Sequence, residues 1–185
     1  MSQKRDKKTK SLKIDPALEA AAHILQERLR TDSIIRESGI APWRPLPEEW
    51  EILSPRARSG VPAWLPQLLD RFDFCEVEFQ LPHPEPEAGY DLLFGFYFPQ
   101  CYEQEVVGWI ADLPSFGFYA FAGEGDGNLW VATAANGPSG DIYLLGSSGW
   151  DGTQPSSENG LIHASTSLAA LLPRLSVSNI YERKA

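Results

Sequence analysis

The sequence has few of the residues that build disulfide frameworks or metal centres. Its 185 residues include two cysteines, three histidines and one methionine. Cys75 and Cys101 lack the Cys-x-x-Cys spacing of zinc and redox motifs, so we expect two free thiols in a reducing compartment. His83 has no metal-ligand companions at useful spacing. The sequence therefore predicts neither a disulfide nor a metal site, and no cofactor.

Long apolar runs are also missing. No stretch approaches the roughly 18 uninterrupted apolar residues of a membrane-spanning helix. The first residues are basic, but no apolar segment like that of a secretory signal follows them. We therefore expect a cytoplasmic protein with no membrane partner.

Aromatic residues, in contrast, are plentiful. The chain contains six Trp, six Tyr and nine Phe, and we expect these large side chains to dominate the core. The length suits one well-cored domain with an extension.

Charge is distributed unevenly along the chain. Residues 1–13 hold six Lys and Arg against Asp6, a net charge of +5. Because the whole chain carries −9, residues 14–185 carry −14. Such an acidic body repels nucleic acid and attracts cationic partners, although solubility alone is an equally good explanation. Nucleic-acid binding is expected only through the basic tail, as a less favoured alternative.

Composition divides the chain into four parts. Residues 1–13 are expected to be a disordered basic tail, and 179–185 a C-terminal tail. Residues 14–60 are predicted as a helical N-terminal extension. Residues 54–60, which are rich in Ser, Pro and Gly, are interpreted as a linker. The main domain is expected at 61–178.

Helix signals dominate the first part of the chain. Asp15 followed by Pro16 is typical of a helix start, and Gly39 is expected to end the helical stretch that follows. A short helix is predicted over 47–53 and an amphipathic helix over 61–72. Apolar residues recur at helical spacing after Pro16, namely Leu18, Ala22, Leu25 and Leu29.

Strand signals follow one another in the second part. A final helix is predicted from Leu168, capped by one of the preceding Ser or Thr residues and confined by Pro173. This order predicts an α+β fold with an antiparallel-dominated central sheet, flanked by N-terminal helices and a C-terminal helix. Residues 103–110 fit either a helix or a strand, and a strand is preferred. Further strands are expected at 74–81, 90–98, 118–122, 129–132, 141–145 and 161–164.

The stretch Phe116–Val131 is a hairpin signal with a Gly-acidic tip. A phosphate loop would have to open a helix, and this tip opens a strand. Glu124, Asp126 and Asn128 have the spacing of the first calcium ligands, but Ala135 stands where the loop requires a carboxylate. The tip is therefore interpreted as a turn with exposed polar side chains.

Signals for catalysis are weak. No Gly-x-Ser-x-Gly motif occurs, and both cysteines lie in ordinary settings. His163 follows two apolar residues and precedes a helix cap, so we interpret it as structural. The sequence thus predicts no catalytic residue.

Several segments between Val61 and Ser176 form a pattern when they are read together. They are Val61-Pro62 with Trp64-Leu65 and Leu68-Leu69, Phe118 to Val131, Gly140 to Leu144, and Ile162 to Leu168 with Leu171-Leu172. This pattern resembles the SUKH superfamily of Smi/Knr-like domains. Gly127-Asn128 stands where that family usually has Gly-Asp.

The resemblance implies a non-enzymatic protein-binding domain. Many bacterial members resemble immunity proteins that neutralise polymorphic or contact-dependent toxins, often nucleases, and an acidic surface suits a basic toxin. The alternative is a small-molecule-binding or hydrolytic protein with an aromatic-lined pocket. At each candidate position, turn formation alone is a competing explanation. The candidate partner-binding residues are Glu124, Asp126, Asn128, Trp150 and Asp151.

Overall fold

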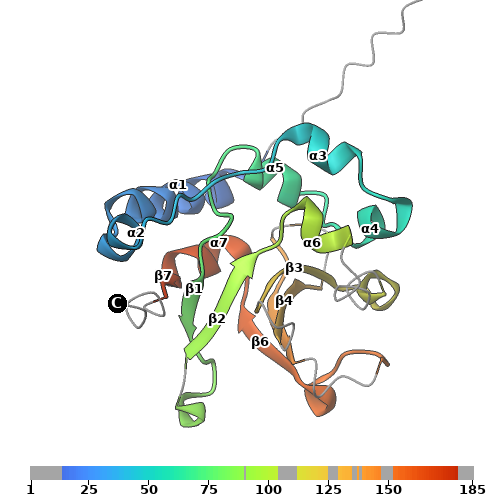
Figure 1. Ribbon diagram of the computed structural model, residues 1–185. Coiled ribbons are helices and arrows are strands. Elements are labelled where there is room, and N and C mark those ends of the chain that lie inside the picture. The colour runs from blue at the N-terminus through green and yellow to red at the C-terminus, as the bar shows by residue number, and fades with distance from the viewer. Residues whose placement is uncertain are drawn as a thin grey trace, which may run out of the picture.

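In the computed structural model, helices come first, strands follow, and a short helix and strand close the chain (Figure 1). The structure describes residues 14–89, 91–103, 112–124, 129–134, 137, 139–146 and 152–178. This arrangement confirms the predicted α+β fold, including the flanking helices at both ends of the chain.

A curled seven-stranded sheet forms the centre of the protein, in the order β6-β5-β4-β3-β2-β1-β7. Each neighbouring pair is antiparallel. The strands are β1 (Phe79–Pro82), β2 (Asp91–Phe96), β3 (Tyr119–Gly123), β4 (Leu129–Thr133), β5 (Ile142–Gly146), β6 (Leu161–Ser165) and β7 (Ser176–Val177).

The predicted hairpin is confirmed as β3 and β4. Ala122 pairs with Val131 and Gly123 with Trp130, and a register shift lies between Ala120 and Ala122. The alternation of small and aromatic residues in β3 places Ala120, Phe121 and Ala122 in the core. The hairpin therefore lies in the middle of the sheet, with β2 on one side and β5 on the other.

The first helices begin and end at the predicted signals. Helix α1 (Pro16–Thr31) starts after Asp15, whose carboxylate accepts hydrogen bonds from the first-turn amides of Ala17 and Leu18. Helix α2 (Ser33–Ser38) ends at Gly39, which has the left-handed conformation at φ 74°.

The C-terminal segment packs against α1. It consists of α7 (Leu168–Leu171), capped by Ser167, and a 3₁₀ turn, η5 (Leu172–Arg174). The Arg28 guanidinium of α1 donates hydrogen bonds to the carbonyl oxygens of Pro173, at 2.9 Å, and Leu175, at 2.5 Å. Pro173 limits the final helix as expected.

Residues 54–60 are not a linker. They form α4 (Pro55–Gly60), because the Ser54 hydroxyl caps the Ala57 amide and Pro55 occupies the first helical position. The neighbouring helices are α3 (Pro47–Glu51) and α5 (Leu65–Leu69). The helix predicted over 61–72 is thus shorter than expected and begins just before Pro66.

The strand predicted over 74–81 begins only at Phe79. Cys75 instead forms an isolated antiparallel bridge with Trp43, and Glu76 adopts a left-handed backbone conformation at φ 62°, which interrupts an extended chain. Of the strand predicted over 103–110, Glu103 belongs to α6 (Pro99–Glu103), and 104–110 lie outside the described residues.

The remaining described elements are short. They are the 3₁₀ turns η1 (Pro86–Ala88), η3 (Leu113–Phe116) and η4 (Ser157–Asn159).

One apolar cluster joins the helices to the sheet. It runs from Ile14, before α1, to Val177 in β7. The aromatic residues dominate its centre as predicted, with Phe74, Phe79, Phe94 and Phe121 all fully buried. The N-terminal helices therefore share their core with the strands.

Candidate protein-binding site

Only one of the five predicted partner-binding residues is described by the structure. Glu124 is half-buried and follows β3 directly. Burial raises the pKa of the Tyr97 hydroxyl, and the nearby Cys101 and Glu124 raise it further. Glu124 thus lies close to a buried tyrosine. Asp126, Asn128, Trp150 and Asp151 lie outside the described residues.

Strand register brings together the points where the two predicted loops leave the sheet. Leu129 of β4 pairs with Gly146 of β5, and Leu145 pairs with Leu161 of β6. The segments 124–128 and 147–160 are therefore joined to the same end of the sheet.

His163 lies on the surface beside Asp141. Its Nε2 is 3.6 Å from the Asp141 carboxylate, and both side chains are about half exposed. The Tyr143 ring contacts the imidazole edge-on, with centroids 5.5 Å apart, and its hydroxyl donates to Asp141 at 3.4 Å. Burial and the Asp141 charge raise the Tyr143 pKa. His163 thus belongs to a small surface cluster with Asp141 and Tyr143 on the sheet.

Both cysteines are free thiols in the structure. Cys75 is fully buried, and this burial raises its pKa to about 12. Burial also raises the pKa of Cys101. The thiolate is the reactive form of cysteine, so neither side chain supplies a nucleophile at neutral pH.

Residues 14–178 contain eight arginines and no lysine. Seven of the eight bind backbone carbonyls or carboxylates within the protein. Four bind carbonyls, namely Arg28, Arg44, Arg58 and Arg174. Three bind carboxylates, namely Arg30, Arg56 and Arg71.

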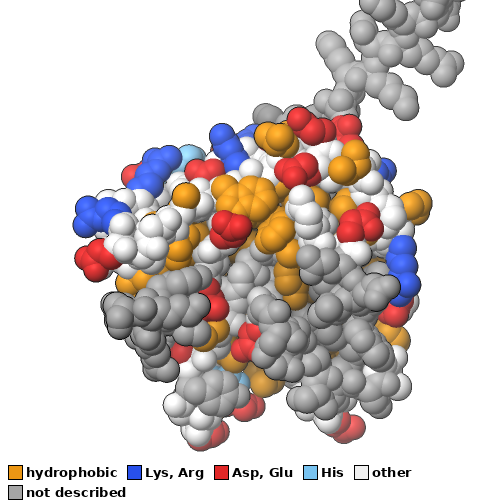
Figure 2. Space-filling model, viewed as in Figure 1, with side chains coloured by type: hydrophobic (Ala, Val, Ile, Leu, Met, Phe, Trp, Pro, Cys, Tyr) orange, Lys and Arg blue, Asp and Glu red, His pale blue; other side chains and the backbone are white. Residues whose placement is uncertain are grey.

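The same region holds 23 Asp and Glu, the chain total of 25 less Asp6 and Glu182. Most of these arginines are thus paired within the protein, and carboxylates outnumber them. Orange and red side chains gather over α3 and α6 on the face shown in Figure 2.

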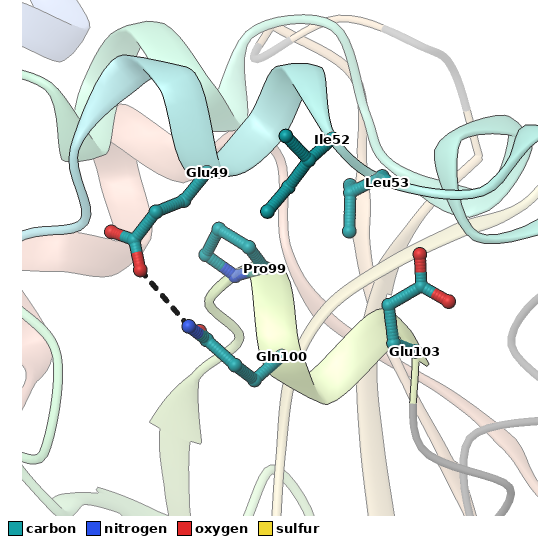
Figure 3. A pocket seen from close by; sticks show the side chains of 6 residues that line it. All are labelled: Glu49, Ile52, Leu53, Pro99, Gln100 and Glu103. Atoms are coloured by element: carbon teal, nitrogen blue, oxygen red, sulfur yellow. Dashed lines mark hydrogen bonds between the residues drawn. The ribbon is translucent and has the colours of Figure 1, made fainter.

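A groove lies between α3 and α6 (Figure 3). It encloses about 450 Å³, within the roughly 300–1,000 Å³ of ligand pockets. Ile52 points toward Pro99 and Leu53 lies beside it on the side of Glu103, with the carboxylates of Glu49 and Glu103 toward opposite ends. The lining residues are Glu49, Ile52, Leu53, Pro99, Gln100 and Glu103.

Hydrogen bonds across the groove hold its two walls together. Gln100 donates from its amide to Glu49 at 2.9 Å. Glu103 accepts from the Ser54 amide at 2.5 Å and from the Ser54 hydroxyl at 3.1 Å. Gln100 of α6 and Ser54, which follows α3, thus hold the two carboxylates in place.

Aromatic packing supports the groove from within the protein. Trp50 of α3 packs against Tyr102 of α6, with ring centroids 6.2 Å apart. The Tyr102 hydroxyl donates to the Ala120 carbonyl of β3 at 2.9 Å. The groove is therefore built on the sheet.

Ile52 is the most exposed large apolar side chain described, at 82%. Sequence reasoning missed Glu49, Ile52 and Glu103, because the groove joins segments about fifty positions apart. The one available signal was an apolar Ile52 directly after an acidic helix.

The aromatic-lined pocket considered as an alternative is not found in the two hollows described. The second hollow lies along α1, and its lining is His23, Ile24, Glu27, Arg28 and Thr31. Neither lining includes Phe, Tyr or Trp, since the aromatic rings named above belong to the core.

In the part of the chain that the structure describes, no three His, Cys, Asp or Glu side chains are grouped to hold a metal ion. None of the helices described there has the length and apolar character needed to cross a bilayer.

Comparison with known proteins adds no relative. No family model matches the chain, no curated protein matches its sequence and no solved structure matches it.

Proposed function

We propose that this chain is a cytoplasmic, non-enzymatic protein-binding domain of the SUKH immunity type, which neutralises a cationic toxin through its acidic surface. The observation that carries the proposal is the use of arginine. Seven of the eight arginines in residues 14–178 are engaged within the protein, against 23 carboxylates in the same region.

This distribution favours a cationic protein partner. Carboxylates that are not matched by surface cations create a negative potential, which raises the association rate with a basic surface. A toxin that cleaves nucleic acid needs a basic surface to bind phosphates. An acidic domain that covers such a surface blocks the substrate.

Co-expression tests the proposal. The full chain is produced in cells with each toxin encoded beside its gene, and survival is measured with and without the chain. We expect rescue from one toxin, and a complex of the purified pair whose association rate falls steeply as salt is raised. The proposal fails if no toxin is neutralised and none forms a complex.

A further inference from the structure

The structure assigns a second and more specific feature to this surface. We propose that the α3–α6 groove is a docking site for a short partner segment with an apolar side chain flanked by Lys or Arg. The inference rests on the proposed protein-binding function and names the chemistry of the partner. The groove includes residues 47–53, which lie outside the segment that resembles the SUKH superfamily.

The apolar part of the groove is exposed to solvent, and the helices that carry it are held in place by contacts with each other. Ile52 is 82% exposed and stands over Pro99, whereas Leu53 beside it is buried. The helices that carry them are held by the Trp50–Tyr102 contact and by the Gln100–Glu49 hydrogen bond. A preformed groove needs little ordering when it binds, so an apolar side chain placed there adds directly to affinity.

The charged part of the site consists of carboxylates without a cation between them. Glu49 accepts from the Leu46 amide and the Gln100 amide, and Glu103 accepts from Ser54. All these donors are neutral. Both carboxylates are therefore fixed in place with their negative charge uncancelled by these contacts, and a charge-assisted hydrogen bond from Lys or Arg is the complementary interaction.

The nearest cations of the same helical region are engaged elsewhere. Arg58 donates to the backbone carbonyls of Glu51 and Leu53, behind the last turn of α3. Arg56 pairs with Asp112 at 3.9 Å. Among the residues that the structure describes, no Lys or Arg lines the groove, so its charge complements a basic segment and opposes an acidic one.

A peptide array tests this assignment with the full chain. The peptides carry one Leu or Phe with Arg at varied positions on both sides, and binding is measured by fluorescence anisotropy at low and high salt. Matched peptides replace the apolar residue by Ser, or each Arg by Glu. We expect binding of the basic apolar set alone, weakened by salt.

Variants locate the binding site. Ile52→Ser is expected to weaken binding about tenfold or more, the loss that follows from no longer burying an aliphatic side chain. Glu49→Gln with Glu103→Gln keeps hydrogen-bond acceptors but removes both charges, and it should reduce affinity and flatten the salt dependence. Ile24→Ser, in the α1 hollow beside Arg28, is the matched control and should bind as the parent does.

Three outcomes overturn the assignment. One is equal binding by Ile52→Ser and the parent, with thermal unfolding showing that both are folded. Another is equal binding of the Ser-substituted peptides, which reduces the site to unspecific charge attraction. The third is an increase of about tenfold in peptide affinity when residues 1–13 are deleted, which would mean that the chain's own basic segment occupies the groove.

The groove and the proposed function fail separately. If the Ile52→Ser variant still neutralises the toxin, the proposed function stands and the groove is not the docking site. If the chain binds the peptides through Ile52 but neutralises no toxin, the docking site stands and the immunity role is refuted.

Discussion

Helices α1 and α3 share a proline at their start and end in different surroundings. Each has proline at its first helical position. Helix α1 packs against the C-terminal segment, whereas Ile52, directly after α3, is exposed to solvent. Leu18, Leu25 and Leu29 of α1 are each 1% exposed, compared with 82% for Ile52. The contrast separates apolar residues that stabilise the fold from one that is available to a partner.

Polar groups follow the same division. At α1, the Arg28 guanidinium donates hydrogen bonds to main-chain carbonyls of the C-terminal segment. At α3, the donors to the carboxylates of Glu49 and Glu103 are neutral groups among the residues that the structure describes. Charge is thus used within the fold at α1, whereas these two carboxylates keep their negative charge at the surface.

The largest expected difference is in the cost of truncating an apolar residue. Leu25→Ala should lower the free energy of unfolding by about 2–5 kcal/mol, because it leaves a cavity between α1 and the core. Ile52→Ala should change it by no more than about 0.5 kcal/mol, since the side chain is already in water. Urea denaturation measures both. A cost for Ile52→Ala close to that of Leu25→Ala would show that the groove is part of the core.

Removing a guanidinium provides the next test. Arg28→Ala should destabilise the protein by about 1–3 kcal/mol, because two carbonyls lose charged donors and one of them lies in a partly buried contact. The control is Arg30→Ala, whose exposed pair with Glu27 should be worth about 0.5 kcal/mol or less. Equal urea midpoints for the two variants would contradict the role given to Arg28.

Local signals predicted the elements whose ends are set within a few residues. Asp15 and Pro16 mark the start of α1, Gly39 the end of α2, and Ser167 the cap of α7. The glycine-rich turn between alternating segments likewise predicted the β3–β4 hairpin. In each case the hydrogen bond or backbone conformation that decides the boundary is made by neighbours in sequence.

Helix α4 was missed although its start is set locally by Ser54 and Pro55. It offers no apolar periodicity, and only Ala57 and Gly60 of its six residues are buried, so its sequence resembles a linker. The other misses depend on distant parts of the chain. The strand at 74–81 starts late because Cys75 bridges to Trp43. The groove was missed for the same reason, since its walls come from 49–53 and 99–103.

Alkaline titration probes the buried core through Cys75. Its pKa rises from 9.0 to about 12 on burial, so between these values the unfolded chain loses a proton that the folded chain keeps. The free energy of unfolding should therefore fall as pH rises above 9, by about 1.4 kcal/mol per pH unit from this group.

The comparison variant for this titration is Cys75→Ala, followed by urea unfolding at several pH values. Tyr97 and Tyr102, whose pKa values are also raised by burial, contribute in the same direction in both proteins. The difference in slope therefore isolates Cys75. Identical slopes would show that its thiol ionises as readily in the folded protein as in the unfolded chain.

The smallest expected effect concerns the start of α3. Asp15 caps α1 with its carboxylate, whereas the corresponding residue of α3 is Leu46, which has no side-chain cap and is 59% exposed. Leu46→Asp should stabilise the protein by about 0.5–1 kcal/mol, because an aspartate at this position accepts from the first-turn amides. Leu46→Ala, which adds no acceptor, is the control. The Glu49 carboxylate already accepts from the Leu46 amide. A urea midpoint for Leu46→Asp no higher than that of Leu46→Ala would mean that this contact already stabilises the start of α3 sufficiently. The difference between the two helix starts would then lie in packing alone.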